Sequence, residues 1–362
     1  MFVNYAAVLV CPDCRGPLDE IRQGESVRAF LCEACDTVFP VKDGIPILLP
    51  VGARNHDLEY PLLADLGRLD PHTTNAPMSF GSAVTRTLAL VALGKDRKSW
   101  EWEDEVYWRR EYQTELSAEQ DKNWDIRVWQ MEWLLARLLS RTTLQGKTII
   151  DVGCGEGQIF RSMFARHCNT DSLYIATDIS IDGLILNRAR NTHRNALYVL
   201  CSADRLPFAK GLADLLCYFG ILHHTERKAA TIPEDSNIVA GDGHIIVHEA
   251  LERPYVSSIL TFLRPAEESA HEERVKKDQL WGVLRSATAL EVVAKKELYS
   301  PVFALTRYLS TVDALNHRWL YSTIGALDAA FLKTFGWMSP ALSAGEVMML
   351  VRKAAPAVQA YQ

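Results

Sequence analysis

Short apolar runs alternate with amphipathic stretches through the middle of the chain. Five runs rich in β-branched and other apolar residues predict buried strands, at 148–152, 173–179, 196–201, 213–219 and 244–249. Helical spacing marks two of the stretches between them, 158–167 and 181–191. Strands that alternate with helices in this order predict an α/β domain whose parallel sheet is covered by helices on both faces.

The segments on either side follow other patterns. Proline and glycine punctuate residues 1–50 and predict short strands, of which 45–49 is the last. An apolar helix is predicted at 84–93, and helical spacing extends from 100 to 141. The C-terminal third predicts four further elements: a helix at 272–288, a strand at 289–297, a helical pair at 303–335 and a strand at 346–352.

These elements suggest three parts of the chain. We expect a small unit at 1–50, a connector with cap helices at 51–140, and the α/β domain at 141–356 with a helical insertion at about 303–335. The insertion is apolar enough to line a pocket or to pair two chains, so a homodimer is one of the expectations.

Composition and charge exclude several classes of protein. The 362 residues are 48% hydrophobic and 23% charged, which is ordinary for a soluble globular protein. The net charge is −6 and no run of Lys or Arg resembles a nucleic-acid arm, which disfavours a partner held through its phosphates. We find no apolar window long enough to span a membrane and no basic start typical of a signal peptide. We therefore expect a cytoplasmic protein.

Four of the eight cysteines lie close together near the N-terminus. They form two pairs with two residues inside each pair and seventeen between the pairs: Cys11, Cys14, Cys32 and Cys35. This spacing is typical of a zinc site, because each pair sits on a tight turn that points both sulfurs inward. Four thiolate ligands leave no open position, so we expect structural Zn²⁺. The alternative is that these are free thiols.

The sequence around these cysteines resembles a known family. The segments that carry the resemblance are CPDCRGPL at 11–18, CEAC at 32–35 and FPVKDGIPILL at 39–49. They look like the small zinc-ribbon subunits that partner RNA and protein methyltransferases. The resemblance covers nearly all of residues 9–50, and it implies a ribbon that docks on a methyltransferase fold in the same chain.

A glycine-rich loop follows the first predicted strand of the α/β domain. The segment IIDVGCGEG at 149–157 places glycines at alternate positions, Gly153, Gly155 and Gly157. Glycine lets the backbone turn tightly and approach a ligand, and the N–H groups of the following helix suit an anion. A dinucleotide fingerprint would require glycine at Gln158, so NAD and FAD are disfavoured. The alternative is a glycine-rich turn of another α/β protein.

This loop matches the motif of class I S-adenosylmethionine-dependent methyltransferases, and the chain resembles the methyltransferase-11-like members. The resemblance implies a Rossmann-like seven-stranded sheet and a loop, with Asp151, that holds the methionine end of the cofactor. Asp178 ends the second strand, where a carboxylate can accept the ribose hydroxyls. Asp204 corresponds to the family's aspartate facing the adenine amino group. The resemblance also implies contacts with the cofactor at Ile179, Ala203, Arg205 and Phe219. Before the sheet, Tyr107 is a candidate contact with the cofactor or part of an aromatic seam.

Ionisable residues end the fourth and fifth strands, where ligands of an open parallel sheet lie. The sequence GILHH at 220–224 is similar to that of sugar and other small-molecule O-methyltransferases. The similarity implies that His223 or His224, with Glu249, accepts the substrate proton. The alternative is histidines that only cap a helix or pack. We expect His248 to be structural, because neighbours along a strand point to opposite faces.

Two substrate classes and one non-enzymatic role stay open. The first is oxygen-directed methylation of a small molecule in secondary metabolism. The second is RNA methylation, since zinc-ribbon guanine methyltransferases of ribosomal RNA join a ribbon to this fold. Against RNA, the basic residues of 1–60 are outnumbered by nine Asp or Glu: Arg15, Arg22, Arg28, Lys42 and Arg54. Amino methyltransferases that act on bases or glutamine carry an Asn-Pro-Pro-Tyr type of motif after the fourth strand. This chain has YFGI at 218–221 instead, which weighs against methylation of the adenine amino group. The third is an inactive scaffold, which the intact loop argues against.

Overall fold

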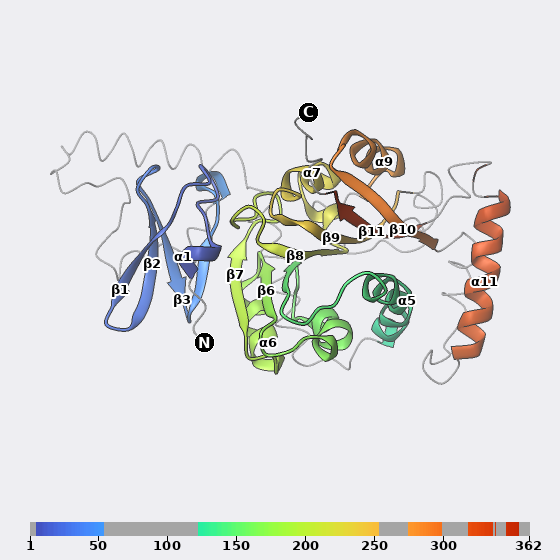
Figure 1. The fold of residues 1–362 in the computed structure, drawn as a ribbon, viewed down its shortest axis with the longest axis horizontal. Helices are drawn as coiled ribbons and strands as arrows, with labels where there is room; N and C mark the ends of the chain where they lie inside the picture. Colours follow the sequence, from blue (N-terminus) through green and yellow to red (C-terminus); the bar gives the residue numbers. More distant parts are fainter. Residues whose placement is uncertain are drawn as a thin grey trace, which may run out of the picture.

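One mixed sheet contains all the strands of the described residues (Figure 1). The computed structural model describes residues 5–53, 122–252, 274–298, 318–335, 337 and 345–354. Within these residues the sheet has 11 strands in the order β1-β2-β3-β4-β7-β6-β5-β8-β9-β11-β10. Their bounds are β1 Asp19–Gln23, β2 Ser26–Cys32, β3 Thr37–Lys42, β4 Ile45–Leu48, β5 Thr148–Val152, β6 Leu173–Asp178, β7 Ala196–Cys201, β8 Ala213–Phe219, β9 Val239–Ala250, β10 Leu290–Leu298 and β11 Glu346–Lys353.

The seven strands from β7 to β10 form the α/β part of the sheet. Strands β5 to β9 pair in parallel, as the sequence predicts. Strand β11, predicted only as a last strand, runs antiparallel to both β9 and β10. Leu298 at the end of β10 pairs with Glu346 at the start of β11, so the chain leaves β10 and enters β11 at the same end of this strand pair. Strand β11 therefore runs in the direction opposite to β10.

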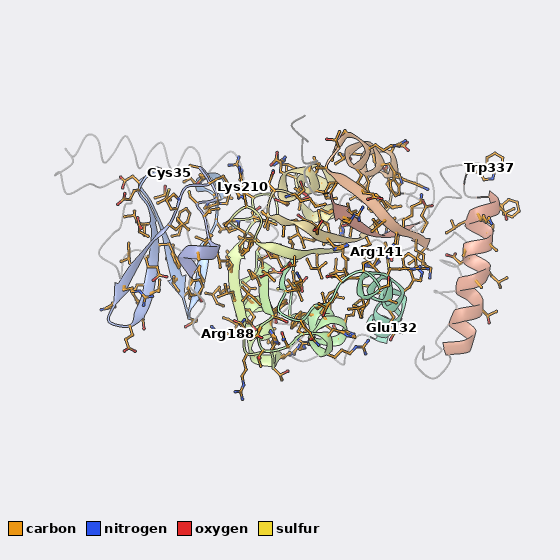
Figure 2. The ribbon with its side chains drawn as sticks, viewed as in Figure 1. Cys35, Glu132, Arg141, Arg188, Lys210 and Trp337 are labelled. Atoms are coloured by element: carbon orange, nitrogen blue, oxygen red, sulfur yellow. The ribbon has the colours of Figure 1, made fainter. Side chains whose placement is uncertain are left out.

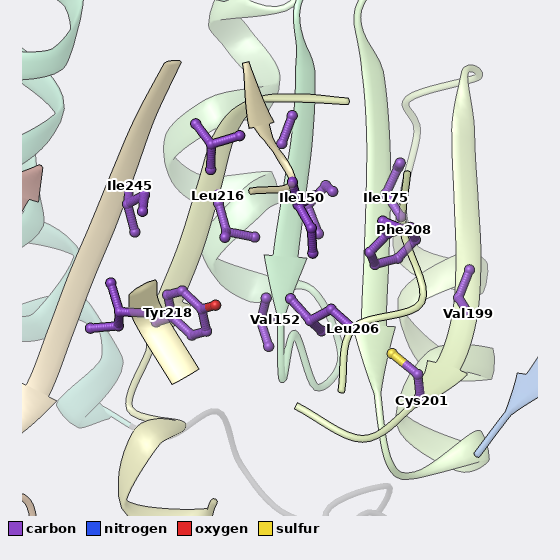
Figure 3. Close-up of a cluster of buried hydrophobic side chains, with 14 of the residues drawn as sticks. Ile150, Val152, Ile175, Val199, Cys201, Leu206, Phe208, Leu216, Tyr218 and Ile245 are labelled. Carbon is purple, nitrogen blue, oxygen red and sulfur yellow. The ribbon is translucent and has the colours of Figure 1, made fainter. Parts of the chain in front are cut away.

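Alternate side chains of the central strands enter two apolar layers. One layer, seen in Figure 3, contains Ile150, Ile175, Leu216 and Ile245. The helices packed on it are α7 (Thr231–Asp235) and α9 (Lys277–Ser286). The opposite layer receives α5 (Lys122–Leu139) and α6 (Ile181–Arg190). Burial on both faces explains why these strands are continuous apolar runs rather than alternating ones.

The helix predicted at 158–167 has an unexpected geometry. It contains a π-helical turn, η2 (Phe160–Phe164), followed by a 3-10 turn, η3 (Ala165–His167). The Phe160 ring stacks on Tyr174, with 3.7 Å between ring centroids and 13° between planes. Hydrophobic spacing predicts a helical segment but does not distinguish these helix types.

The N-terminal unit is joined to the α/β part through backbone hydrogen bonds. Strand β4 pairs in parallel with β7, so that Ile47 lies opposite Leu200. Helix α1 (Tyr5–Val8) leads into a bridge between Leu9 and Phe208, beside which the Val10 N–H donates to the Pro207 carbonyl at 2.9 Å. The unit therefore extends the sheet at the β7 edge and contacts the loop that follows β7.

The remaining described elements are short turns and one outlying helix. The short turns are η1 (Val51–Ala53), η4 (Leu222–His224) and η5 (Lys228–Ala230). Helix α11 (Arg318–Phe335) lies beyond β10 and exposes Leu327 and Phe335 (Figure 1). No helix among the described residues is long and apolar enough to cross a lipid bilayer. The predicted helix at 84–93, the stretch 100–121 with Tyr107, and residues 303–317 lie outside the described residues.

Candidate functional site

Four cysteine sulfurs come together at one end of the N-terminal unit. The Sγ atoms of Cys11, Cys14, Cys32 and Cys35 all lie within 4.8 Å of one another. The sulfurs of Cys14 and Cys32 are 3.5 Å apart, close to the about 3.8 Å edge of a tetrahedron with Zn–S bonds near 2.3 Å. Figure 2 labels Cys35 at the end of the unit that carries this cluster. The donor set and its spacing fit one tetrahedral Zn²⁺.

The first cysteine turn also contacts the α/β part. Its geometry is set by hydrogen bonds from the Arg15 N–H to the Cys11 carbonyl and from the Cys11 N–H to the Gly16 carbonyl, both 2.9 Å. The Arg15 guanidinium donates to the carbonyls of Leu206 and Phe208, the second at 3.0 Å. One arginine therefore joins the metal-binding turn to the loop that carries Asp204.

The glycine loop between β5 and η2 has a left-handed backbone that only glycine adopts easily. Gly153, Gly155 and Gly157 have φ of 63°, 51° and 74°. A Cβ on Gly153 would lie 2.5 Å from the side chain of Ile221, and one on Gly157 would lie 2.3 Å from Asn187. The loop is thus packed closely against the turn after β8 on one side and against α6 on the other.

Asp178 at the end of β6 braces this loop. Its two carboxylate oxygens accept the N–H groups of Gly155 and Ser180, each at 2.8 Å. Burial raises the pKa of Asp178, and the hydrogen bonds from Ser180 and Gly155 lower it. Each oxygen keeps a second lone pair, so the carboxylate retains the capacity to accept hydroxyl groups.

Asp204 has a comparable role in the loop after β7. Its carboxylate accepts the N–H groups of Glu226 and Arg227 at 3.0 and 3.1 Å, which ties this loop to the turn after β8. The neighbouring Arg205 is more than half exposed and lies 4.0 Å from Asp13 of the N-terminal unit. The loops after β5, β6, β7 and β8 therefore meet at the carboxyl ends of the parallel strands.

A buried histidine–carboxylate pair lies at the same edge of the sheet. Nδ1 of His223 lies 2.5 Å from Oε1 of Glu249, and both side chains are buried. The Glu249 carboxylate also accepts the N–H groups of Leu222 at 2.7 Å and Ala250 at 2.8 Å. These bonds satisfy a carboxylate that has no solvent exposure and fix the imidazole beside it.

The structure separates the roles of the other two histidines. The ring of His224 lies 4.1 Å from that of His223, centroid to centroid. Burial, and after it the neighbouring His223 and Lys228, lowers the pKa of His224 to about 3, so it is a weak base. His248 faces the other side of the sheet, where its Nε2 lies 3.0 Å from Oε2 of Glu346. Of the three candidate catalytic residues, the structure thus brings His223 and Glu249 together.

Comparisons with known proteins agree with this geometry. A family model described as a methyltransferase domain matches residues 150–247, which span the glycine loop and the strands up to β9. A second model, described as Trm112p-like protein, matches residues 6–44, which contain the cysteine cluster. The chain is an S-adenosylmethionine-dependent methyltransferase with a Trm112-like zinc ribbon.

Relatives of the ribbon are small bacterial proteins. A UPF0434 protein of Bordetella pertussis is 47% identical over 54 residues, which are 15% of the methyltransferase and 82% of that relative. A UPF0434 protein of Azoarcus is 43% identical over 54 residues, with the same coverage of 15% and 82%. The ribbon of the methyltransferase belongs to this family, and its cluster is a structural zinc site.

Solved structures resemble the longer part of the methyltransferase. A putative methyltransferase from Bacillus halodurans has a TM-score of 0.42 and 19% identity, covering 61% of this chain and 99% of the other. A complex between the Haloferax volcanii Trm112 methyltransferase activator and a putative methyltransferase has a TM-score of 0.41 and 16% identity, covering 65% and 95%. At these values neither likeness says anything about the substrate.

Residues that sequence reasoning missed also contact the site of the methyltransferase. They are Arg15 on the zinc turn, Tyr174 on β6 and Asn187 on α6. Glu346 on β11, also missed, pairs with His248 on the other face of the sheet. Tyr174 offered a signal, since it places a hydroxyl in the apolar first part of β6, between Leu173 and Ile175. The others gave none, because their partners lie far away along the sequence.

The tight packing of the glycine loop gives a direct prediction. We expect Gly157→Ala to weaken binding of S-adenosylhomocysteine by roughly tenfold or more, about 1.4 kcal/mol, because the new Cβ would lie 2.3 Å from the Asn187 side chain and must displace either that side chain or the loop. The matched control is Gly146→Ala, which has φ of 68° but nothing within 4 Å of the added Cβ. Calorimetry should show wild-type affinity for the control. Equal affinities for both variants would contradict the prediction.

Proposed function

We propose that the enzyme transfers the methyl group of S-adenosylmethionine to a hydroxyl group of a small molecule, with His223 as the general base. The observation that carries the proposal is the buried pair of His223 and Glu249 beside the cofactor loop. The cofactor supplies an electrophilic methyl group on a sulfonium. A hydroxyl attacks it better when its proton is removed, and an imidazole suits that step.

The hydrogen bond to Glu249 fixes the direction of proton transfer. In the neutral imidazole an Nδ1–H that donates to Glu249 leaves the lone pair on Nε2. His223 would take the substrate proton at Nε2 as the oxygen–methyl bond forms and the sulfur–methyl bond breaks. The buried carboxylate would stabilise the resulting imidazolium. Ile221, two residues before His223, packs on Gly153, which supports a position of the base close to the cofactor.

The same proposal assigns the residues that would hold the cofactor. The N–H groups of the glycine loop suit the carboxylate of the methionine end, and Asp151 suits its ammonium group. Asp178 would accept ribose hydroxyls, and Asp204 would face the adenine amino group. Further cofactor contacts are proposed for Ile179, Ala203, Arg205 and Phe219, and for Tyr107, which lies outside the described residues. In the ribbon, all four cysteines are proposed as the zinc ligands.

Charge favours a small acceptor over RNA. The ribbon carries more acidic than basic residues. Two of its arginines have partners inside the protein: Arg15 donates to carbonyls of the loop after β7, and Arg22 donates to Glu20 at 2.7 Å. A surface that binds phosphates requires available cations. The specific observation that favours RNA or protein methylation is the Trm112-like ribbon itself, whose relative in the solved complex is a methyltransferase activator.

Labelled methyl transfer from S-adenosylmethionine tests the proposal. The enzyme is incubated with three pools from a cell extract: dialysable small molecules, total RNA and protein. We expect label in the small-molecule pool, in a product that mass spectrometry identifies as a methyl ether. Ribonuclease-sensitive label, or label in protein, would overturn the proposal in favour of the second candidate. Calorimetry with S-adenosylhomocysteine tests binding of the cofactor separately. A protein that binds neither S-adenosylmethionine nor S-adenosylhomocysteine would be a scaffold.

A further inference from the structure

A chain of buried hydrogen bonds lies beneath the glycine loop. The Asn187 Nδ2 donates to the Tyr174 hydroxyl at 3.1 Å, and this hydroxyl donates to Oδ2 of Asp151 at 3.2 Å. Tyr174 and Asn187 are fully buried and Asp151 is nearly so. The direction of the chain is fixed, because an amide nitrogen only donates and a carboxylate only accepts.

Asn187 also supports the loop itself. Its Nδ2 lies 3.3 Å from Sγ of Cys154, and its carboxamide lies directly against Gly157. Its Oδ1 is buried without a hydrogen-bond partner among the described residues. A buried acceptor without a partner costs free energy that an apolar side chain would avoid. The hydrogen bonds that the amide nitrogen donates, rather than packing, therefore explain an asparagine at this position.

The Asp151 carboxylate requires a donor to remain charged. Its pKa is raised to about 7: burial is the largest cause, the hydrogen bond from Tyr174 opposes the rise, and the Asp178 carboxylate adds to it. Among the described residues, the other titratable groups that interact with it are the thiols of Cys154 and of Cys217 on β8. None of these groups is a cation at neutral pH, so the Tyr174 hydroxyl is the stabilising partner that these neighbours offer.

We propose that Tyr174 and Asn187 are positioning residues that keep the Asp151 carboxylate charged and thereby set the pH range in which the enzyme binds its cofactor. The inference rests on the proposed contact between Asp151 and the cofactor's ammonium group. Stacking on Phe160 fixes the ring of Tyr174, and Asn187 fixes the direction of its hydroxyl. When Asp151 takes up a proton it loses its charge, so affinity falls as the pH drops below about 7.

Tyr174→Phe tests this proposal because it removes only the hydroxyl. Binding of S-adenosylhomocysteine is measured by calorimetry between about pH 6 and 9. Without its donor, Asp151 holds a proton to higher pH. We expect the midpoint of the affinity profile to rise by about one pH unit, with affinity about fivefold weaker near pH 7, about tenfold weaker near pH 6 and close to wild type near pH 9. The ligand's own amino group titrates equally with both proteins, so the difference isolates the enzyme.

Two further variants keep the test decisive. Asn187→Leu keeps the number and branching of the side-chain heavy atoms but removes the donor to Tyr174, and it should raise the midpoint in the same direction by a smaller amount. Thr177→Val is the matched control, because the Thr177 hydroxyl donates to the main-chain oxygen of Asp151 at 3.2 Å and not to its carboxylate. Its midpoint should equal that of wild type.

The outcomes separate this inference from the proposed function. A wild-type midpoint retained by both Tyr174→Phe and Asn187→Leu would overturn the inference, as would wild-type affinity that does not vary with pH. If Tyr174→Phe does not fold, the midpoint of Asn187→Leu decides alone. Failure of the wild-type enzyme to bind the ligand at every pH would refute the cofactor proposal instead.

Discussion

Cys32→Ser is expected to abolish zinc binding and unfold the ribbon while much of the α/β core remains folded. The fully buried aromatic side chains of the ribbon are Phe30 and Phe39, and the buried side chains of β4, such as Ile47, lie on the strand that pairs with β7. A unit of this size depends on its metal. Structural Zn²⁺ contributes about 10–16 kcal/mol to the folding of comparable zinc-finger peptides. Without it, strand β4 should separate from β7, and Arg15 should release the carbonyls of the loop that carries Asp204.

Three measurements check this result. Elemental analysis should give one zinc per wild-type chain and none for Cys32→Ser, and limited proteolysis should cut the variant within residues 9–49. The affinity for S-adenosylhomocysteine should fall, because the loop after β7 loses its support. Cys168→Ser is the matched control, since this half-buried cysteine lies outside the cluster and donates to the Phe164 carbonyl. A Cys32→Ser protein with full zinc and wild-type protease resistance would show that the cluster is not the metal site.

His223→Ala should slow methyl transfer by about 10²–10⁴-fold, the usual contribution of a general base, and leave affinity for S-adenosylhomocysteine unchanged. The side chain is held by Glu249, which is not among the residues proposed to bind the cofactor. Glu249→Gln should also slow transfer, because a neutral amide stabilises the imidazolium less than a carboxylate does. It should also lower the melting temperature, because a carboxamide leaves one of the Leu222 and Ala250 N–H groups facing another donor.

Two control variants sharpen this test. His224→Ala should have a small effect, because a group with a pKa near 3 accepts protons poorly at neutral pH. His248→Ala removes a comparable buried histidine that pairs with Glu346 on the other face of the sheet, and its turnover should match wild type. Single-turnover rates with labelled cofactor distinguish these cases. Should His223→Ala retain the wild-type rate, the base must lie elsewhere.

Much of the fold follows from apolar runs in the sequence. Strands β5, β7 and β8 begin and end where those runs do, because both faces of each strand are buried. Strand β9 begins earlier than its apolar run, at Val239, since backbone pairing with Ala213 extends it through polar and glycine residues. The pairing of β4 with β7 could not be predicted, because an apolar pattern identifies a strand but not its neighbour.

The candidate site, like the fold, was predictable from the sequence only in part. The cysteine cluster and the glycine loop were predictable, because their residues are close together in the sequence and their spacing reflects one turn. The pairing of His223 with Glu249 followed from the rule that adjacent strand ends meet. The chain from Asn187 to Asp151 was missed, because it joins a helix, a strand and a loop through side chains whose orientation depends on packing. Its discovery required the three-dimensional arrangement.

The position of the ribbon at the β7 edge has a consequence for the behaviour of the protein at high concentration. A sheet that ended at β7 would present an apolar strand with unpaired backbone groups, which favours edge-to-edge aggregation. With the ribbon attached, the outermost strand is β1, which is short and carries Asp19, Glu20 and Arg22. Because the ribbon is covalently part of the chain, dilution cannot remove this protection as it could for a dissociable subunit.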